Sequence, residues 1–150
     1  PAQFRDPEGQ WVGLSKRARV IIYNKAAGAP EGLDTYEDLA DPSLRGAICV
    51  RSSTNVYNQS LLAAIIARQG REAALAWAKG VVANFARQPE GNDTAQIEAT
   101  AAGLCRIGLV NSYYVARFVG TGDAARDAIG EKIGVIFPNQ ETTGAHVNVS

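Results

Sequence analysis

Hydrophobic residues recur along the chain with two different spacings. Short runs rich in Val and Ile, such as RARVIIYN at 17–24, are typical of buried β-strands. Longer stretches place apolar residues on one helix face, as Leu61, Leu62, Ile65 and Ile66 do. Because the two kinds of segment alternate, the pattern predicts an α/β fold with a mixed, mostly parallel central sheet flanked by helices.

Turn and cap residues set the expected boundaries of these elements. The expected strands span residues 17–24, 47–52, 106–111, 133–139 and 145–150. Asn55 is placed to cap a helix that Gly70 ends, and Asp93 or Thr94 is placed to open another. The remaining expected helices lie in the first part of 33–46, before a turn closed by Gly46, and at 71–88, 113–120 and 123–132. Residues 1–16 read as an irregular leader.

Composition and charge exclude several functions. The 150 residues fit one domain, and 15 Lys+Arg balance 15 Asp+Glu, so the charge predicts no nucleic-acid partner. No apolar run approaches the roughly 18 residues of a membrane span. The chain has none of the standard hydrolase or nucleotide-binding motifs. His146 is the sole His and has no second His or Cys at metal spacing, so we expect it to be a structural or rim residue. We expect no enzymatic activity.

Two adjacent tyrosines, Tyr113 and Tyr114, follow the strand expected at 106–111. Neighbouring side chains point to opposite faces of a strand and lie about 100° apart on a helix, so two phenol oxygens can meet only where one element turns into the other. Ligands of such sheets bind beyond the carboxyl ends of strands, where Tyr57 is also expected. The three tyrosines therefore either share one cleft or are amphipathic rim residues.

Charged and sulfur-containing residues add two further hypotheses. Arg51 lies beside an expected helix N-terminus, which makes either an anion site or a solvated charge. Cys49 and Cys105 lie at the start of two expected strands. They are either buried free thiols or, if the strands are adjacent, a disulfide; we favour the disulfide, which would indicate an oxidising compartment.

Several segments resemble the periplasmic ferric-ion-binding proteins, the substrate-binding components of bacterial iron(III) ABC transporters. The similar segments are VRSSTNVYNQSLLAAIIA, GNDTAQIEATAAG and IGLVNSYYVARF, and the likeness extends over nearly the whole chain. One departure is Arg106, which stands where an acidic residue is usual. The resemblance implies one lobe, the second, of a two-lobed type 2 periplasmic binding protein, with RARVIIYN and HVNVS as the crossings between lobes. The chain contains no Met and opens without a start signal, so we expect it to be part of a longer protein whose first lobe is missing here.

The resemblance also implies a set of ligands and partners. Tyr57, Tyr113 and Tyr114 match tyrosines that coordinate Fe³⁺, while Asn111 and Asn92 fall where some members contact a synergistic anion such as carbonate, phosphate or citrate. The implied partners are ferric ion, the missing N-terminal lobe and the membrane permease of an ABC transporter in the periplasm. Ferric ion prefers anionic oxygen donors, and a trivalent cation can displace the phenol proton at neutral pH.

Two alternatives to this function stay open on the sequence. The first is a lobe that binds an organic anion or a metal chelate through Arg51, Asn92 and Asn111. The second is an enzyme that uses a phenol as acid or base, but we find no second polar catalytic group for it.

Overall fold

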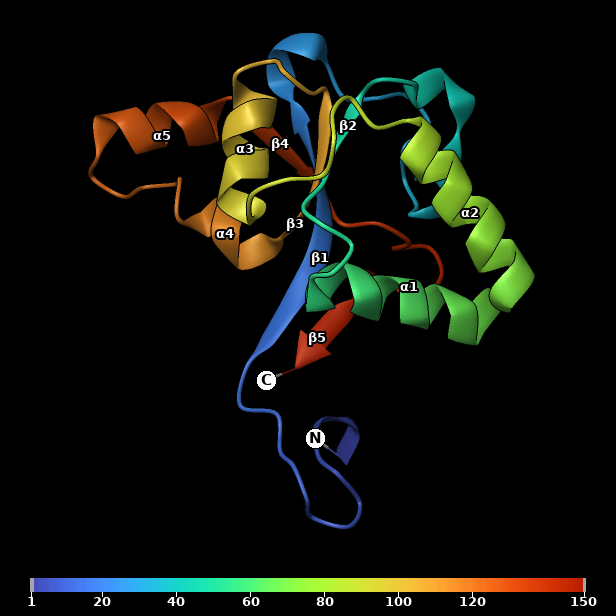
Figure 1. Cartoon of the computed structure of the whole chain (residues 1–150). Helices are drawn as coiled ribbons and strands as arrows, with labels where there is room; N and C mark the ends of the chain where they lie inside the picture. The colour runs from blue at the N-terminus through green and yellow to red at the C-terminus, as the bar shows by residue number, and fades with distance from the viewer. Residues whose placement is uncertain (1, 150) are drawn as a thin grey trace.

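Five strands form a mixed sheet in the computed structural model, which describes residues 2–149. The strand order is β2-β3-β1-β4, and β5 pairs with the first residues of β1. β1 is the longest strand and lies in the middle of the sheet (Figure 1). The bounds of the strands are β1 Lys16–Asn24, β2 Ile48–Cys49, β3 Ile107–Asn111, β4 Ile133–Ile136 and β5 Val147–Val149.

The strand directions correct the prediction of a mostly parallel sheet. β2 and β3 are parallel, whereas β1 is antiparallel to β3, β4 and β5. Since β3 and β4 both oppose β1, the three strands β2, β3 and β4 share one direction, as strands linked through helices do. β1 inserts between β3 and β4 in the reverse direction. The sequence could not show this, because the hydrophobic period of a strand is the same in either direction.

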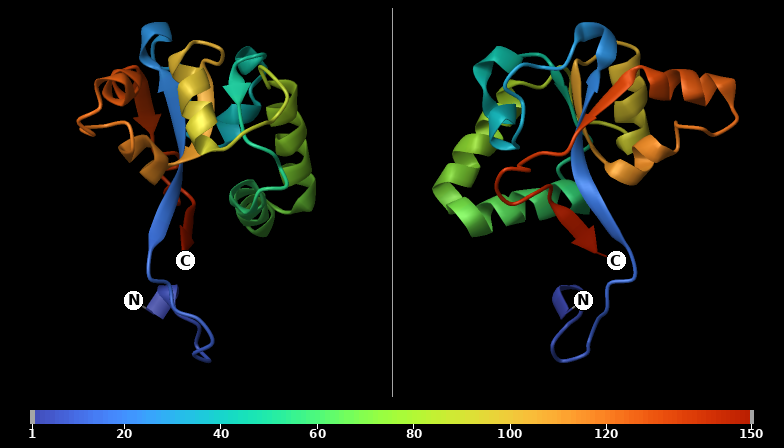
Figure 2. Two further views of the ribbon diagram at one scale, coloured as in Figure 1. Left: turned by 60° about the vertical axis from the view of Figure 1, so that its left-hand side comes forward. Right: turned by 180° about the vertical axis from the view of Figure 1, so that it is seen from behind.

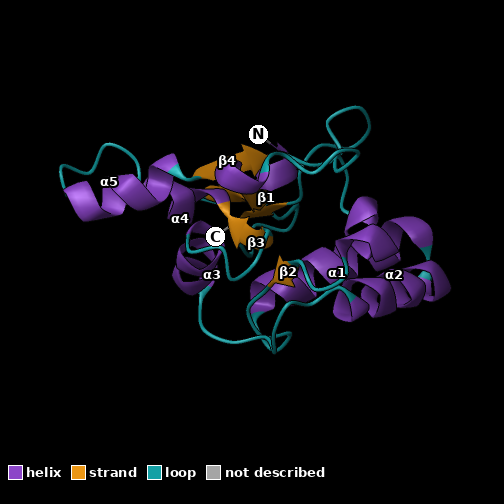
Figure 3. Ribbon diagram, turned by 90° about the horizontal axis from the view of Figure 1, so that it is seen from above, coloured by secondary structure: helices purple, strands orange, loops and turns teal. Residues whose placement is uncertain are grey.

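Helices cover both faces of the sheet. Figures 1 and 3 show α1 and α2 on one side and α3, α4 and α5 on the other. The side chain of Asn55 caps α1 by accepting from the N–H of Tyr57, and Gly70 ends this helix at a φ of 85°, both as predicted. The bounds are α1 Val56–Gln69, α2 Arg71–Ala83, α3 Asp93–Ala101, α4 Ser112–Ala116 and α5 Ala124–Glu131.

Several predicted elements are shorter in the structure because side chains divert the backbone. α2 ends at Ala83 rather than near 88, since the Asn84 amide donates to the carbonyl oxygens of Leu39 and Asp41. β2 ends at Cys49 rather than 52, because the carbonyls beyond it accept from the side chain of Asn58. Two 3₁₀ helices, Glu37–Ala40 and Pro42–Leu44, replace the helix predicted within 33–46, and Gly46 then turns the chain at a φ of 71°.

Alternating residues of β1 supply two separate cores. Ile21 faces α1 and α2, whereas Val20 and Ile22 face the other side of the sheet. This is the two-residue period of a strand that is buried on both faces. The first core includes Ile21, Ile48, Ile107, Leu109, Leu61, Ile65 and Val81, and the second includes Val20, Ile22, Val110, Ile97, Phe118 and Ile133.

Both ends of the chain lie at the same end of the sheet. The segment that precedes β1 extends away from the body, near β5 (Figures 1 and 2). It carries a 3₁₀ helix at Ala2–Phe4 and exposes Trp11, Val12 and Leu14. Among the described residues, no helix is both long and apolar enough to cross a membrane.

The predicted disulfide between Cys49 and Cys105 is present. The two Cα atoms lie 5.8 Å apart, and both residues are buried. Cys49 is in β2 and Cys105 lies two residues before β3, so the parallel pairing of these strands brings the sulfurs together. The two cysteines are 56 positions apart in the sequence, so the bond closes a long loop of the chain.

Candidate metal-binding site

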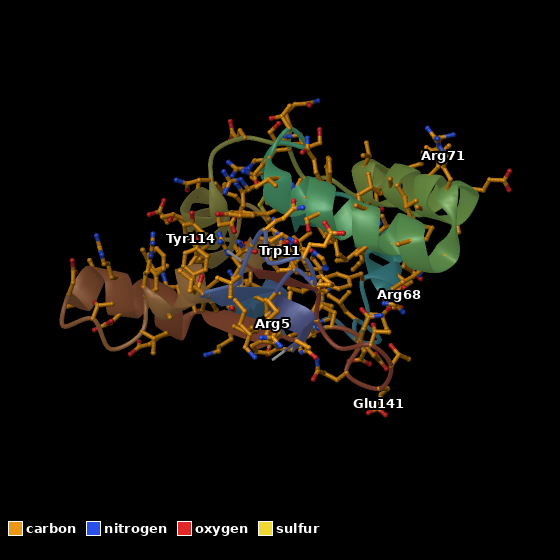
Figure 4. All side chains as sticks on the ribbon, turned by 90° about the horizontal axis from the view of Figure 1, so that it is seen from below. Arg5, Trp11, Arg68, Arg71, Tyr114 and Glu141 are labelled. Atoms are coloured by element: carbon orange, nitrogen blue, oxygen red, sulfur yellow. A yellow bond between two sulfur atoms is a disulfide. The ribbon has the colours of Figure 1, made fainter. Side chains whose placement is uncertain are left out.

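The adjacent tyrosines occupy a turn in which a strand passes directly into a helix. β3 ends at Asn111 and α4 begins at Ser112, so Tyr113 and Tyr114 lie in the first turn of the helix. Their ring centroids are 4.4 Å apart, at an interplanar angle of 35°. Both side chains are half-buried, and Figure 4 shows Tyr114 on α4. The abrupt turn thus brings two neighbouring phenols together, which neither a regular strand nor a regular helix would do.

Tyr57 joins this pair from the first turn of α1. The hydroxyl of Tyr113 is hydrogen-bonded with those of both Tyr57 and Tyr114, so the three oxygens form one polar cluster. The three residues come from the two segments that follow β2 and β3. Because these strands are parallel and adjacent, their carboxyl ends lie side by side. The strand pairing therefore explains why residues 56 positions apart meet.

Four arginines surround the tyrosine cluster. Arg17 donates from Nη1 to the Tyr57 hydroxyl at 3.0 Å, and its guanidinium carbon lies 5.4 Å from the Tyr57 ring centroid. Arg51 lies over the same ring at 5.4 Å and Arg19 at 6.0 Å. Arg117, one turn further along the chain, lies 4.8 Å from the ring centroid of Tyr114 and 5.3 Å from that of Tyr113. These cations favour phenolate over phenol.

The cluster moves two phenol pKa values in opposite directions. The hydrogen bond with Tyr113 lowers the pKa of Tyr57, and the positive charges of Arg17 and Arg51 lower it further. Burial raises the pKa of Tyr113, and its hydrogen bonds with Tyr114 and Tyr57 act in the same direction. Tyr57 is therefore the phenol that gives up its proton before Tyr113, and Tyr113 is the donor that stabilises the resulting anion.

A buried ionic network centred on Asp93 holds the residues around the cluster in place. Asp93 accepts from Arg19 Nη1 at 2.8 Å and from Arg51 Nη1 at 3.2 Å, and both Arg19 and Asp93 have fully buried side chains. The same carboxylate accepts from the backbone N–H of Asn111 at 2.8 Å. Arg19 also donates to the amide oxygen of Asn58 at 2.7 Å. Asp93 thereby fixes two of the arginines over Tyr57 and the turn that carries Tyr113.

The three residues predicted to bind an anion have different environments. Arg51 is paired with Asp93 beside Tyr57. Asn111 is fully buried, and its Nδ2 has no hydrogen-bond partner among residues 2–149. Asn92 is exposed and caps α3, since its amide oxygen accepts from the N–H of Ala95 at 3.1 Å. Arg51 and Asn111 thus connect to the tyrosine cluster through Asp93, whereas the Asn92 oxygen is occupied at the start of α3.

Sequence reasoning missed most of the charged residues of the site. Arg17 and Arg19 are two positions apart on β1, a spacing that places both side chains on one face of a strand. Arg117 follows Tyr113 by four positions and Tyr114 by three, which are helix-neighbour spacings. Both signals are visible in the sequence. Asp93 was assigned only a capping role, because a sequence does not show that a helix start will be buried.

The imidazole of His146 has a structural partner. His146 is half-buried, and its Nε2 lies 2.9 Å from the hydroxyl of Ser60. Burial lowers the pKa of this imidazole. Within residues 2–149, no group of three or more His, Cys, Asp or Glu side chains could hold a metal ion.

The chain matches a known protein family. The model for the bacterial extracellular solute-binding proteins matches residues 1–118. This range includes the tyrosine cluster and all four arginines that surround it.

Individual relatives match the whole chain. The chain is 55% identical over 150 residues to iron uptake protein A1 of Synechocystis. The matched region covers 100% of the chain and 42% of that protein. The chain is 31% identical to the Fe(3+)-binding periplasmic protein of Serratia marcescens, and the matched region covers 99% of the chain and 42% of that protein. The solved structure of a Trichodesmium protein, IdiA (FutA), in complex with iron and citrate, is 55% identical in sequence and superposes with a TM-score of 0.95. The superposition covers 100% of the present chain and 48% of the Trichodesmium chain. The chain spans a little under half the length of these relatives.

Proposed function

Because the chain belongs to the bacterial extracellular solute-binding proteins and has the type 2 periplasmic-binding-protein fold of its structural neighbours, we propose that it binds ferric ion. The family and fold predicted from the sequence are confirmed, and such proteins are solute-binding proteins rather than enzymes. The proposed ligands are the phenolate oxygens of Tyr57, Tyr113 and Tyr114. The observation that carries this proposal is the hydrogen-bonded cluster of their three hydroxyls within a frame of arginines.

The chemistry of the donors matches a hard trivalent cation. Each phenol that binds the ion loses its proton, and three phenolates neutralise the 3+ charge. The hydrogen bond with Tyr113 and the charges of Arg17 and Arg51 lower the pKa of Tyr57, so they assist this ionisation before the metal arrives. Because binding releases phenol protons, acid should release the metal.

The same arginines favour an anion as an additional ligand. Once three phenolates balance the ferric ion, the charges of Arg17, Arg51 and Arg117 remain beside it. Three protein oxygens also leave about half of an octahedral coordination shell to be filled. Carbonate, phosphate or citrate would supply the remaining oxygens and offset the positive charge. The amide nitrogen of Asn111, which has no hydrogen-bond partner among residues 2–149, supports a donor role towards that anion.

The length of the relatives supports a role within a larger protein. We infer that the chain is the second lobe of a periplasmic binding protein, which a first lobe completes by closing over the metal. The complete protein would deliver ferric ion to the permease of an iron(III) ABC importer. The first residues of β1 pair with β5 at one end of the sheet, an arrangement that supports these two strands as the crossings to another lobe (Figure 2).

The test is the visible absorption of the protein with ferric citrate. Phenolate-to-iron charge transfer should colour the complex, and Tyr57→Phe, Tyr113→Phe and Tyr114→Phe should each weaken or shift the band. Each variant should also lose ferric affinity by more than about 100-fold, since even outer-shell partners of metal ligands change affinity by about 10–100-fold. Competition against a chelator measures the affinity.

A matched control is available in Tyr23. It lies in β1 outside the cluster, so Tyr23→Phe should leave the band and the affinity unchanged. Circular dichroism of all four variants checks that the fold is intact. Wild-type colour in all three cluster variants would contradict the proposed ligands. Colourless binding of ferric citrate would instead favour recognition of the chelate.

A further inference from the structure

A cavity of about 580 Å³ opens between α1, α2 and the β2–β3 edge of the sheet. Its walls are mostly apolar and include Leu62, Trp77, Val82 and Phe85, with Leu109 of β3 at the sheet. This size and this lining are typical of sites for small organic molecules. The indole N–H of Trp77 donates to the carbonyl of Tyr36, so this wall is held in place from behind.

Two guanidinium groups contribute to the lining of this apolar cavity. Arg87, in the segment after α2, uses Nη1 to pair with Glu90 and Nη2 to donate to Gln96. Arg51 uses Nη1 to pair with Asp93. The Nε atoms of both Arg87 and Arg51 are buried and have no hydrogen-bond partner in the described part of the chain. These Nε atoms are not accessible from the cavity, so a ligand would meet the exposed part of each side chain, which is 28% exposed for Arg87 and 16% for Arg51.

We propose that this cavity binds an amphipathic monocarboxylate, with its apolar tail against Trp77 and Val82 and its carboxylate against the partly exposed guanidinium group of Arg87. The charge of Arg87 selects an anion, and the apolar walls select a hydrocarbon body over a hydrated inorganic ion. Arg51 offers a second donor on the side nearest Tyr57. The site is separate from the tyrosine cluster in its chemistry, because its ligand is organic and carries no metal.

The fluorescence of Trp77 reports directly on occupancy. The chain has two tryptophans, and Trp11→Phe leaves Trp77 as the only one. The probe is octanoate, titrated into the iron-free 150-residue chain of this variant, and octanamide is the neutral probe of the same shape. Octanoate should shift the Trp77 emission saturably. Octanamide should bind about tenfold more weakly, since a hydrogen bond to a charged group contributes more than a neutral one.

Two variants in the same background locate the carboxylate. Arg87→Gln removes the positively charged guanidinium group and should weaken octanoate about tenfold, towards the affinity of octanamide. Arg71→Gln is the matched control, because Arg71 is an exposed arginine at the outer end of α2 (Figure 4). It should leave octanoate binding unchanged. Ala78→Phe, which narrows the cavity, should abolish binding of both probes.

The competing outcomes are distinct. No saturable change in Trp77 emission, equal affinity for octanoate and octanamide, or an equal loss in Arg87→Gln and Arg71→Gln would each overturn the proposal. Arg87→Gln should also keep the wild-type ferric band. Failure of the octanoate site with an intact band, or the reverse, separates this inference from the proposed metal site.

Discussion

Removing the carboxylate of Asp93 should be among the most destabilising single changes in this protein. Asp93→Ala leaves the fully buried Arg19 guanidinium without its ion-pair partner and the buried N–H of Asn111 without its acceptor. Breaking a buried ion pair by removing one partner costs about 3–5 kcal/mol. The orphaned N–H adds to this, although contributions within one network are not additive. We therefore expect the free energy of unfolding to fall by about 4 kcal/mol.

This loss is large for a chain of 150 residues. Domains of such size have total stabilities of about 5–15 kcal/mol, and 1 kcal/mol shifts the melting temperature by about 2–4 °C. The expected fall in melting temperature is therefore about 10 °C. Urea unfolding followed by circular dichroism measures the free energy, and an unchanged slope against urea shows that the folded state is still compact.

Two further variants test the reason for this loss. Asp34→Ala removes an exposed carboxylate and should change stability by less than about 0.5 kcal/mol. The double variant Arg19→Met with Asp93→Leu replaces both charges with apolar groups and should recover part of the stability lost in Asp93→Ala. An Asp93→Ala protein within 1 kcal/mol of the wild type would refute the claim that this carboxylate holds the two arginines.

Two other predictions concern stability. Reduction of the Cys49–Cys105 disulfide should lower the free energy of unfolding by about 4 kcal/mol in the chain-entropy model, measured by urea unfolding with and without reductant; a loss below 1 kcal/mol would contradict it. Tyr36 is buried, and burial raises the pKa of its phenol to about 12. Below pH 10 the phenol is protonated in both the folded and unfolded states, whereas between pH 10 and 12 only the unfolded state releases its proton, so stability falls as pH rises through this window. Tyr36 should account for about 3 kcal/mol of the loss, so Tyr36→Phe should lose about 3 kcal/mol less than the wild type in an unfolding series across this pH range; an equal loss in both proteins would exclude Tyr36 as the cause.

The sequence predicted those features of the fold that depend on local pattern. The caps of α1 at Asn55 and Gly70 depend on residues within one turn, and the structure has both. The direction of β1 and the early end of α2 at Ala83 depend on partners that are distant in the sequence. Asn84 ends α2 by bonding to Leu39 and Asp41, more than 40 residues earlier, and no local propensity encodes that contact.

The candidate site shows the same division between local and long-range information. The sequence indicated the tyrosines because a phenol pair at a strand-to-helix turn is unusual in itself. The sequence did not indicate Arg17 and Arg19, because β1 reaches Tyr57 only through the pairing of β1 with β3, which sets Arg19 opposite Asn111. That register puts the positive charge of β1 beside the carboxyl end of β3, where α4 begins. The antiparallel insertion of β1, which the hydrophobic pattern did not predict, is thus what carries Arg17 and Arg19 to Tyr57 and, with Arg51, surrounds its phenol with positive charge.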